Sequence, residues 1–189
     1  MNRPTKLTLL RMFLIPFIVV LSYIDARWTH WAMLAIFLAA SITDWLDGYL
    51  ARKHNQVTTL GKLLDPLADK LLVLTAFLVL LEHRNLPAWL VILMIGREMA
   101  ITGLRAFLAA EKVILPAGQA GKWKMVFQVI ALSFLFVASE HIVFYYVGMI
   151  TMGIALILSL WSASWYLIDF WQLLGEKIMA EQMAGKKRV

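Results

Sequence analysis

Asp44-Trp-Leu-Asp47-Gly48-Tyr-Leu-Ala51-Arg52 is followed, after eight residues, by Gly61-Lys-Leu-Leu-Asp65-Pro-Leu-Ala-Asp69. This stretch holds four of the twelve acidic residues of the chain, and apolar sequence flanks it on both sides. Residues three or four apart share a helix face, so Asp44 would lie beside Asp47, and Asp65 beside Asp69. Two such helices could bring the four carboxylates together. Four close carboxylates require cations, and oxygen ligands favour Mg²⁺ or Mn²⁺.

The composition is that of a membrane protein. Hydrophobic residues make up 61% of the 189 residues, and the mean hydropathy is +0.75. A soluble domain has roughly 45–50% apolar residues. The net charge of +6 could suggest nucleic acid, but in so apolar a chain it indicates cytoplasmic loops and contact with anionic lipid. We therefore expect membrane lipids, and no nucleic acid, as partners.

The absence of cysteine limits the chemistry that the chain can perform. There are no Cys residues, which excludes disulfides, thiolate nucleophiles and zinc sites of the cysteine type. The four His residues are scattered and form no ligand spacing. The candidate metal ligands are therefore the carboxylates.

Six apolar segments predict an all-α integral membrane protein with six transmembrane helices. A span needs about 20 residues. We expect spans at about 7–23, 31–50, 63–81, 89–110, 125–138 and 142–170, the last of which is long enough to extend past the interface. Residues 1–189 are expected to form a single membrane-embedded domain that ends in a basic tail at about 175–189.

The distribution of basic residues predicts the orientation. Six spans place both termini on one side of the membrane. Every Lys and Arg except Arg27 and Arg84 falls on that side. Because cytoplasmic loops carry an excess of Lys and Arg, we expect a multi-pass cell-membrane protein whose termini and acidic stretch face the cytoplasm.

The aspartates also have an interpretation without chemistry. Each could lie at the membrane interface, solvated or paired with a nearby Lys or Arg. Gly48 and Gly61 could serve only close helix packing. Four carboxylates at helical spacing on two adjacent segments favour function, since ionisable residues within spans are costly and usually functional.

The pattern Asp-x-x-Asp-Gly-x-x-Ala-Arg, eight residues, Gly-x-x-x-Asp-x-x-x-Asp resembles the signature of the CDP-alcohol phosphotransferases. Every fixed position of that signature is present here, and the six expected spans agree with the family along nearly the whole chain. The resemblance implies a membrane enzyme that moves a phosphatidyl-type group from a CDP-linked lipid or alcohol to a second alcohol and releases CMP. It also implies a homodimer.

The resemblance implies a role for individual residues. Asp44, Asp47 and Asp65 would hold two divalent cations, Mg²⁺ or Mn²⁺, with Asp69 at the same cluster. Asp69 would also take the proton from the acceptor hydroxyl. The expected CDP-diacylglycerol site consists of Thr8, Gly48, Ala51, Arg52, Thr58 and Gly61.

Basic residues on the same side suggest where the acceptor binds. They occur in Gly96-Arg97-Glu98, in Gly103-Leu-Arg105 and in Gly121-Lys122-Trp-Lys124. One interpretation pairs Arg97 with Glu98 or with a lipid headgroup. The other is an anion pocket for a phosphorylated acceptor. These motifs resemble the bacterial phosphatidylglycerophosphate synthase branch, which implies that Arg97, Arg105, Lys122 and Lys124 bind sn-glycerol 3-phosphate.

Two classes of alternative remain at this point. Within the family, the chain could be a cardiolipin synthase or a phosphatidylinositol-phosphate synthase. In a different class, the aspartates could line the ion path of a cation transporter. Carboxylates that gather near one side, interleaved with Gly and Arg, favour a phosphate site over an ion path.

Overall fold

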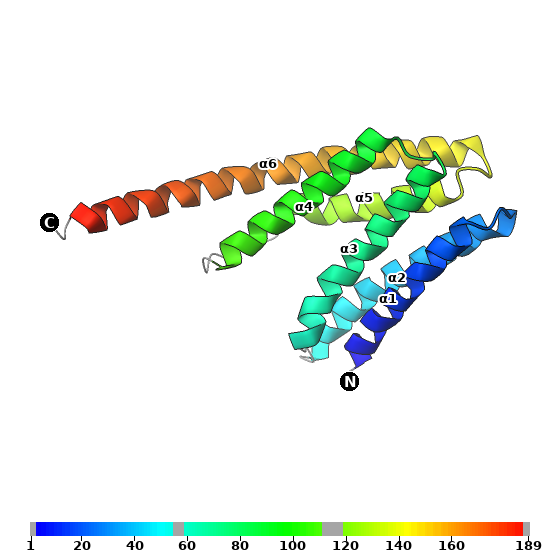
Figure 1. The fold of residues 1–189 in the computed structure, drawn as a ribbon, viewed down its shortest axis with the longest axis horizontal. Helices are drawn as coiled ribbons and strands as arrows, with labels where there is room; N and C mark the ends of the chain where they lie inside the picture. The colour runs from blue at the N-terminus through cyan, green and yellow to red at the C-terminus, as the bar shows by residue number, and fades with distance from the viewer. Residues whose placement is uncertain (1–2, 55–58, 111–118, 187–189) are drawn as a thin grey trace.

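The fold consists entirely of α-helices within the part of the chain that the computed structural model describes, residues 3–54, 59–110 and 119–186. Side chains are described at 10–43, 67–110 and 121–172. The helices, drawn in Figure 1, are α1 (Arg3–Ser22), α2 (Arg27–His54), α3 (Thr59–Glu82), α4 (Ala88–Ala110), α5 (Gln119–Phe136) and α6 (Ile142–Lys186). Each predicted apolar segment corresponds to one of these helices.

The helices differ from the predicted segments mainly at their ends. Helix α1 begins before the expected span, at Arg3, and α6 continues to Lys186 through most of the segment expected as a basic tail. Helical hydrogen bonding does not stop where the apolar sequence stops. Residues 171–186 are rich in Leu, Met, Ala, Gln, Glu and Lys, which favour helix, and they contain no Pro.

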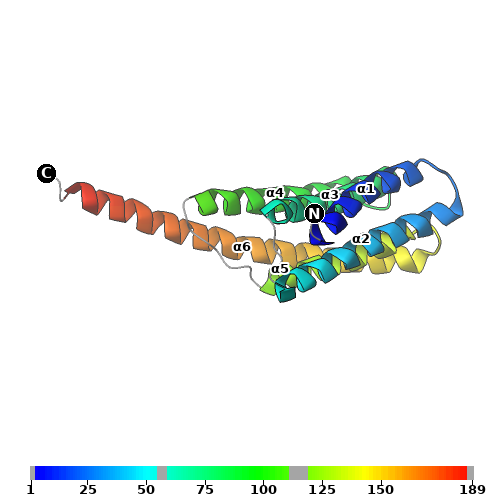
Figure 2. The same cartoon turned by 90° about the horizontal axis from the view of Figure 1, so that it is seen from below.

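The helices form two layers. Figure 2 shows α1, α3 and α4 in one layer and α2, α5 and α6 in the other. Contacts between α1 and α2, and between α4 and α6, join the layers. Figure 1 shows the last turns of α6 extending well past the other helices.

Three short connections gather at one end of the molecule, on the right in Figure 1. The Asn85 side chain donates a hydrogen bond to the Leu135 carbonyl at 3.2 Å, which ties the α3–α4 turn to α5. The hydroxyl of Ser139 lies 2.9 Å from Nδ1 of His30, which ties the α5–α6 turn to the start of α2. The end of α2 and the start of α3, which carry the acidic stretch, therefore lie at the opposite end.

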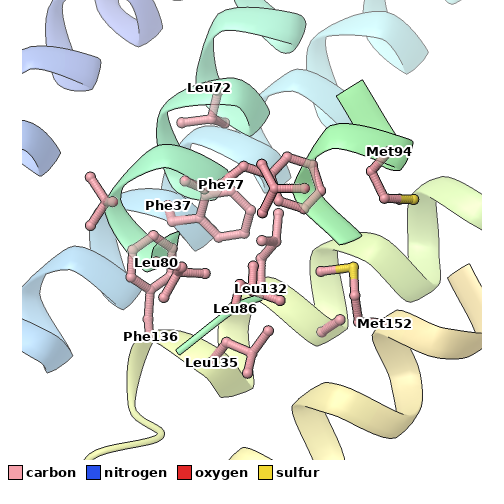
Figure 3. Close-up of a cluster of buried hydrophobic side chains, with 14 of the residues drawn as sticks. Phe37, Leu72, Phe77, Leu80, Leu86, Met94, Leu132, Leu135, Phe136 and Met152 are labelled. Carbon is pink, nitrogen blue, oxygen red and sulfur yellow. The ribbon is translucent and has the colours of Figure 1, made fainter. Parts of the chain in front are cut away.

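An apolar core holds the two layers together (Figure 3). Phe37 of α2 and Phe136 of α5 pack with ring centroids 5.4 Å apart. Phe77 of α3 and Met152 of α6 are at most 2% exposed in the same cluster. Because each of these six helices contributes to one close-packed core, their polar residues are held at defined positions.

Glycine permits the close approach of α5 and α6. A Cβ atom placed on Gly148 of α6 would lie 2.7 Å from Cγ of Leu135 on α5, closer than real side chains approach. A small residue at such a crossing lets helix backbones pack closely. Gly153, farther along α6, faces open space.

The outer surface is strongly apolar. Within the described residues, one helical segment, Ile142–Gln172 of α6, has the length and mean hydropathy (2.1) of a membrane span, and only 22% of its most apolar window is buried. Trp161 and Trp171 are 62% and 67% exposed on it. The other expected spans do not meet the same criteria within the described residues, and α4 carries Arg97, Glu98 and Arg105 in its 23 residues.

Candidate active site

A cavity of about 310 Å³, lined by several charged side chains, lies between α3, α4, α5 and α6. Every sequence-predicted site residue whose side chain the structure describes lines it. The lining residues are Asp69, Lys70, Arg97, Glu98, Ile101, Thr102, Arg105, Gly121, Lys122, Lys124, Met125, Ser162 and Tyr166. Residues from four helices thus place the predicted base and the predicted anion-binding residues in one cavity.

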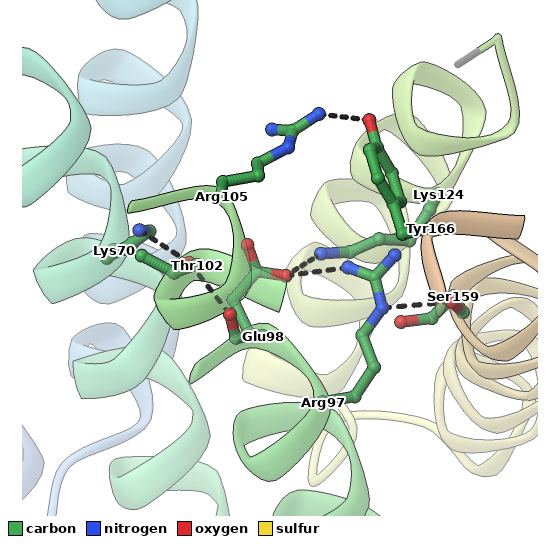
Figure 4. A network of polar contacts seen from close by, with 8 residues as sticks. All are labelled: Lys70, Arg97, Glu98, Thr102, Arg105, Lys124, Ser159 and Tyr166. Carbon is green, nitrogen blue, oxygen red and sulfur yellow. Dashed lines mark hydrogen bonds and ion pairs between the residues drawn. The ribbon is translucent and has the colours of Figure 1, made fainter. Parts of the chain in front are cut away.

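Glu98 is the centre of an ion-pair network (Figure 4). Its Oε2 accepts a hydrogen bond from Nη1 of Arg97 at 3.2 Å and another from Nζ of Lys124. Nε of Arg97 donates to the backbone carbonyl of Ser159 on α6 at 2.9 Å. The side chains of Arg97 and Lys124 are only 9% and 7% exposed. The pairing of Arg97 with Glu98, left open by the sequence, is therefore present. The network ties α4 to α5 through Lys124 and to α6 through the Ser159 carbonyl.

Arg105 is held by Tyr166 of α6. The guanidinium group donates a hydrogen bond to the Tyr166 hydroxyl, and its central carbon lies 4.6 Å from the centre of the ring. A guanidinium over an aromatic face is stabilised by the ring quadrupole. Figure 4 shows Tyr166 extending from α6 toward Arg105. Arg105 is an exposed residue, so its position depends on this contact.

Lys70 and Thr102 connect α3 with α4 at the cavity. Nζ of Lys70 donates a hydrogen bond to Oγ1 of Thr102 at 2.8 Å. Thr102 Oγ1 in turn donates to the Glu98 backbone carbonyl at 2.7 Å. Lys70 follows Asp69 directly in α3, so this contact also helps to position the part of α3 that carries Asp69.

The cavity carries an excess of positive charge. Five cationic and two anionic side chains line it, which leaves three more positive than negative charges. Partial burial strengthens charge interactions relative to bulk water. The half-buried Asp69 provides a carboxylate on the α3 side, and the cations lie mainly on α4 and α5. This arrangement suits a small ligand that carries both a phosphate and a hydroxyl group.

The family model described as CDP-alcohol phosphatidyltransferase matches residues 1–161. The chain belongs to this family. The match covers the acidic stretch and the helices that form the cavity up to residue 161, and the rest of α6, with the cavity residues Ser162 and Tyr166, follows the matched region.

Three proteins similar to this chain share one name, CDP-diacylglycerol–glycerol-3-phosphate 3-phosphatidyltransferase. The protein from Bacillus subtilis (strain 168) is 44% identical over 146 residues, which is 71% of this chain and 76% of the relative. The proteins from Shigella flexneri serotype 5b (strain 8401) and Escherichia coli (strain K12) are 41% and 40% identical over 172 residues, covering 88% of this chain and 93% of each relative.

Most of the predicted metal and nucleotide ligands lie where the structure does not describe side chains. Asp44 and Asp47 belong to α2, and Asp65 belongs to α3 with Asp69. Among the predicted site residues, Thr58 lies outside the described residues altogether. For eight others the structure describes the helix but not the side chain: Thr8, Asp44, Asp47, Gly48, Ala51, Arg52, Gly61 and Asp65. The described side chains contain no metal-binding cluster of three ligands. The side chains of three of the four predicted metal ligands, Asp44, Asp47 and Asp65, are not among those described, so the predicted metal site stays a prediction.

Sequence reasoning did not identify several residues of the cavity. Lys70, Thr102, Ser162 and Tyr166 line it without having been predicted as site residues. The sequence does contain an indication for Lys70, because a charged residue directly after Asp69 within an apolar segment is unusual unless it has a role at the site. Ser162 and Tyr166 are four residues apart in α6, so they share one helix face, but isolated hydroxyls in an apolar span are common.

Proposed function

We propose that this family member transfers the phosphatidyl group of CDP-diacylglycerol to sn-glycerol 3-phosphate and releases phosphatidylglycerophosphate and CMP. The observation that carries the proposal is the cavity in which Asp69 and the cations of α4 and α5 meet. A phosphorylated alcohol requires both an anion site and a base for its hydroxyl. Relatives that cover most of this chain bear the name of this activity.

The chemical step follows from the positions of these groups. The acceptor phosphate binds near Arg105 and Lys122, and its reacting hydroxyl lies toward Asp69. The Asp69 carboxylate takes the proton as the hydroxyl oxygen bonds to the phosphorus that carries the diacylglycerol. The bond from that phosphorus to the bridging oxygen of the pyrophosphate breaks, and CMP leaves with that oxygen. Asp69 is effective only when well positioned, because a carboxylate has an ordinary pKa of about 3.9.

The acidic stretch has the donor set expected for a metal site. Asp44, Asp47 and Asp65, together with Asp69, offer only carboxylate oxygens, which suit Mg²⁺ or Mn²⁺. Two bound cations would neutralise charge on the pyrophosphate of the donor. The expected donor-binding residues around them are Thr8, Gly48, Ala51, Arg52, Thr58 and Gly61.

We further propose that all six helices lie in the membrane, with the cavity and both termini on the cytoplasmic side. The apolar outer surface of α6 supports a lipid environment, because exposed Trp161 and Trp171 are unfavourable in water. The scarcity of Lys and Arg at the end with the short connections supports the orientation. A homodimer, which the family resemblance implies, belongs to the same proposal.

A panel of acceptors tests the function. The purified protein is supplied with CDP-diacylglycerol, Mg²⁺ and one acceptor at a time: glycerol 3-phosphate, glycerol, inositol 1-phosphate or phosphatidylglycerol. CMP release and the lipid product are measured. We expect efficient turnover only with glycerol 3-phosphate, and loss of turnover with excess chelator that added Mg²⁺ restores. Efficient use of plain glycerol would contradict a phosphate-binding cavity, and full activity in chelator would contradict the metal site.

A further inference from the structure

Helix α6 presents a polar stripe to the inside of the protein. Ser159, Ser162 and Tyr166 are 0%, 4% and 6% exposed, whereas Trp161 and Trp165 of the same helix are 62% and 56% exposed. The stripe therefore faces the other helices and not the outer surface. Ser159 supplies the carbonyl that binds Arg97, and Tyr166 binds Arg105, so two of its three residues already position cations of the cavity.

The third residue of this stripe, Ser162, has an available hydroxyl group. Ser162 lines the cavity, and its hydroxyl has no hydrogen-bond partner among the described residues. Its Oγ faces Gly121 of α5, where an added Cβ atom would lie 3.7 Å away. A hydroxyl that lines a cavity without a protein partner is free to bind a ligand or water there. The absence of a side chain at Gly121 leaves the space beside it open.

The position of Ser162 suits one part of the acceptor. Ser162 precedes Tyr166 by four residues, which separates them by about 6 Å along α6. A phosphate bound at Arg105, beside Tyr166, would thus place the carbon chain of the acceptor along the stripe toward Ser162. Asp69 lies on a different helix, α3, and faces the same cavity. Glycerol 3-phosphate has one hydroxyl that reacts and a second that does not.

We propose that Ser162 is a specificity-determining residue that hydrogen-bonds the non-reacting hydroxyl of the acceptor. This inference rests on the proposed function. The acceptor is then held at three separate points: the phosphate by the cations, the reacting hydroxyl by Asp69 and the second hydroxyl by Ser162. A site built to bind a hydroxyl discriminates against an analogue that lacks it. One neutral hydrogen bond corresponds to roughly a three- to tenfold effect on kcat/KM.

An acceptor without the second hydroxyl tests the proposal. 3-Hydroxypropyl phosphate keeps the phosphate and the reacting hydroxyl of glycerol 3-phosphate. We expect the unaltered protein to use it with a kcat/KM about three- to tenfold lower. Ser162→Ala should lower kcat/KM for glycerol 3-phosphate by the same factor and leave the value for 3-hydroxypropyl phosphate unchanged, so that the variant no longer distinguishes the two acceptors.

Ser164→Ala is the matched control. Ser164 is an exposed serine on the same helix, and its hydroxyl bonds the Trp161 carbonyl at 2.8 Å. This variant should retain the discrimination of the unaltered protein. Equal losses for both acceptors in Ser162→Ala, or no loss for either, would overturn the role of Ser162. If the unaltered protein does not use glycerol 3-phosphate, the proposed function itself fails, which is a separate result from the same assay.

Discussion

Replacing Glu98 by Gln should destabilise the protein and weaken acceptor binding together. Glu98 Oε2 accepts charge-assisted hydrogen bonds from Arg97 and Lys124, and each such bond contributes about 1.5–3 kcal/mol. An amide oxygen accepts at about half that strength, so two weakened bonds lose about 1.5–3 kcal/mol in total. The Glu98 side chain is 37% exposed, and solvent screening favours the lower part of that range, about 1.5–2 kcal/mol.

Thermal unfolding in detergent measures the first effect of Glu98→Gln. In a chain of 150–250 residues, 1 kcal/mol shifts Tm by about 2–4 °C, so we expect a decrease of about 3–8 °C. Glu140→Gln is the control, because Glu140 pairs at 3.4 Å with Arg27, whose side chain is 87% exposed. Such a surface pair contributes about 0–1 kcal/mol. Equal Tm values for the two variants would refute the assignment of Glu98 as the centre of the network.

Steady-state kinetics measure the second effect. Without the carboxylate, Arg97 and Lys124 lose the group that positions them in the cavity, so KM for glycerol 3-phosphate should rise. KM for CDP-diacylglycerol should change little, because none of the proposed donor-binding residues lies on α4 or α5. A rise in the donor KM alone would show that the network serves the other substrate.

Three further results are expected. Tyr166→Phe keeps the ring but removes the hydroxyl that binds Arg105, so KM for glycerol 3-phosphate should rise about three- to tenfold while kcat is retained, as acceptor titrations would show. Gly148→Ala should lower Tm because its methyl group enters α5, whereas Gly153→Ala, in open space, should leave Tm unchanged or raise it. Asp69→Asn should reduce turnover about 10²–10⁴-fold with nearly normal binding of CDP-diacylglycerol, whereas a parallel loss of donor binding would make it chiefly a metal ligand.

Local sequence patterns predict the helices well, because each is a long apolar segment bounded by polar residues. They also predict which basic residues lie at the end with the acidic stretch. Local patterns do not predict which side chains pair with each other across helices. Lys124 comes 26 residues after Glu98, and only the packing of α4 and α5 around the cavity brings the two together. The sequence alone left two interpretations of Arg97 open for the same reason.

The contribution of α6 to the cavity is the feature that the sequence conceals. Ser162 and Tyr166 are two polar residues in a long apolar helix, and nothing in their spacing shows which face the helix buries. That face depends on close packing against α5, which Gly148 permits. The apolar pattern also does not predict that α6 continues to Lys186, because the apolar residues that mark a membrane span end before the helix does.

The central claim, that the cations of the cavity bind the phosphate of the acceptor, is tested most directly by the two KM values of Arg105→Ala and Lys122→Ala. One charge-assisted hydrogen bond to phosphate contributes about 1.5–3 kcal/mol, which corresponds to roughly a ten- to hundredfold change in binding. We predict that KM for glycerol 3-phosphate rises by this factor in each variant and that KM for CDP-diacylglycerol barely changes. Equal increases in both KM values, or an unchanged acceptor KM, would contradict the account.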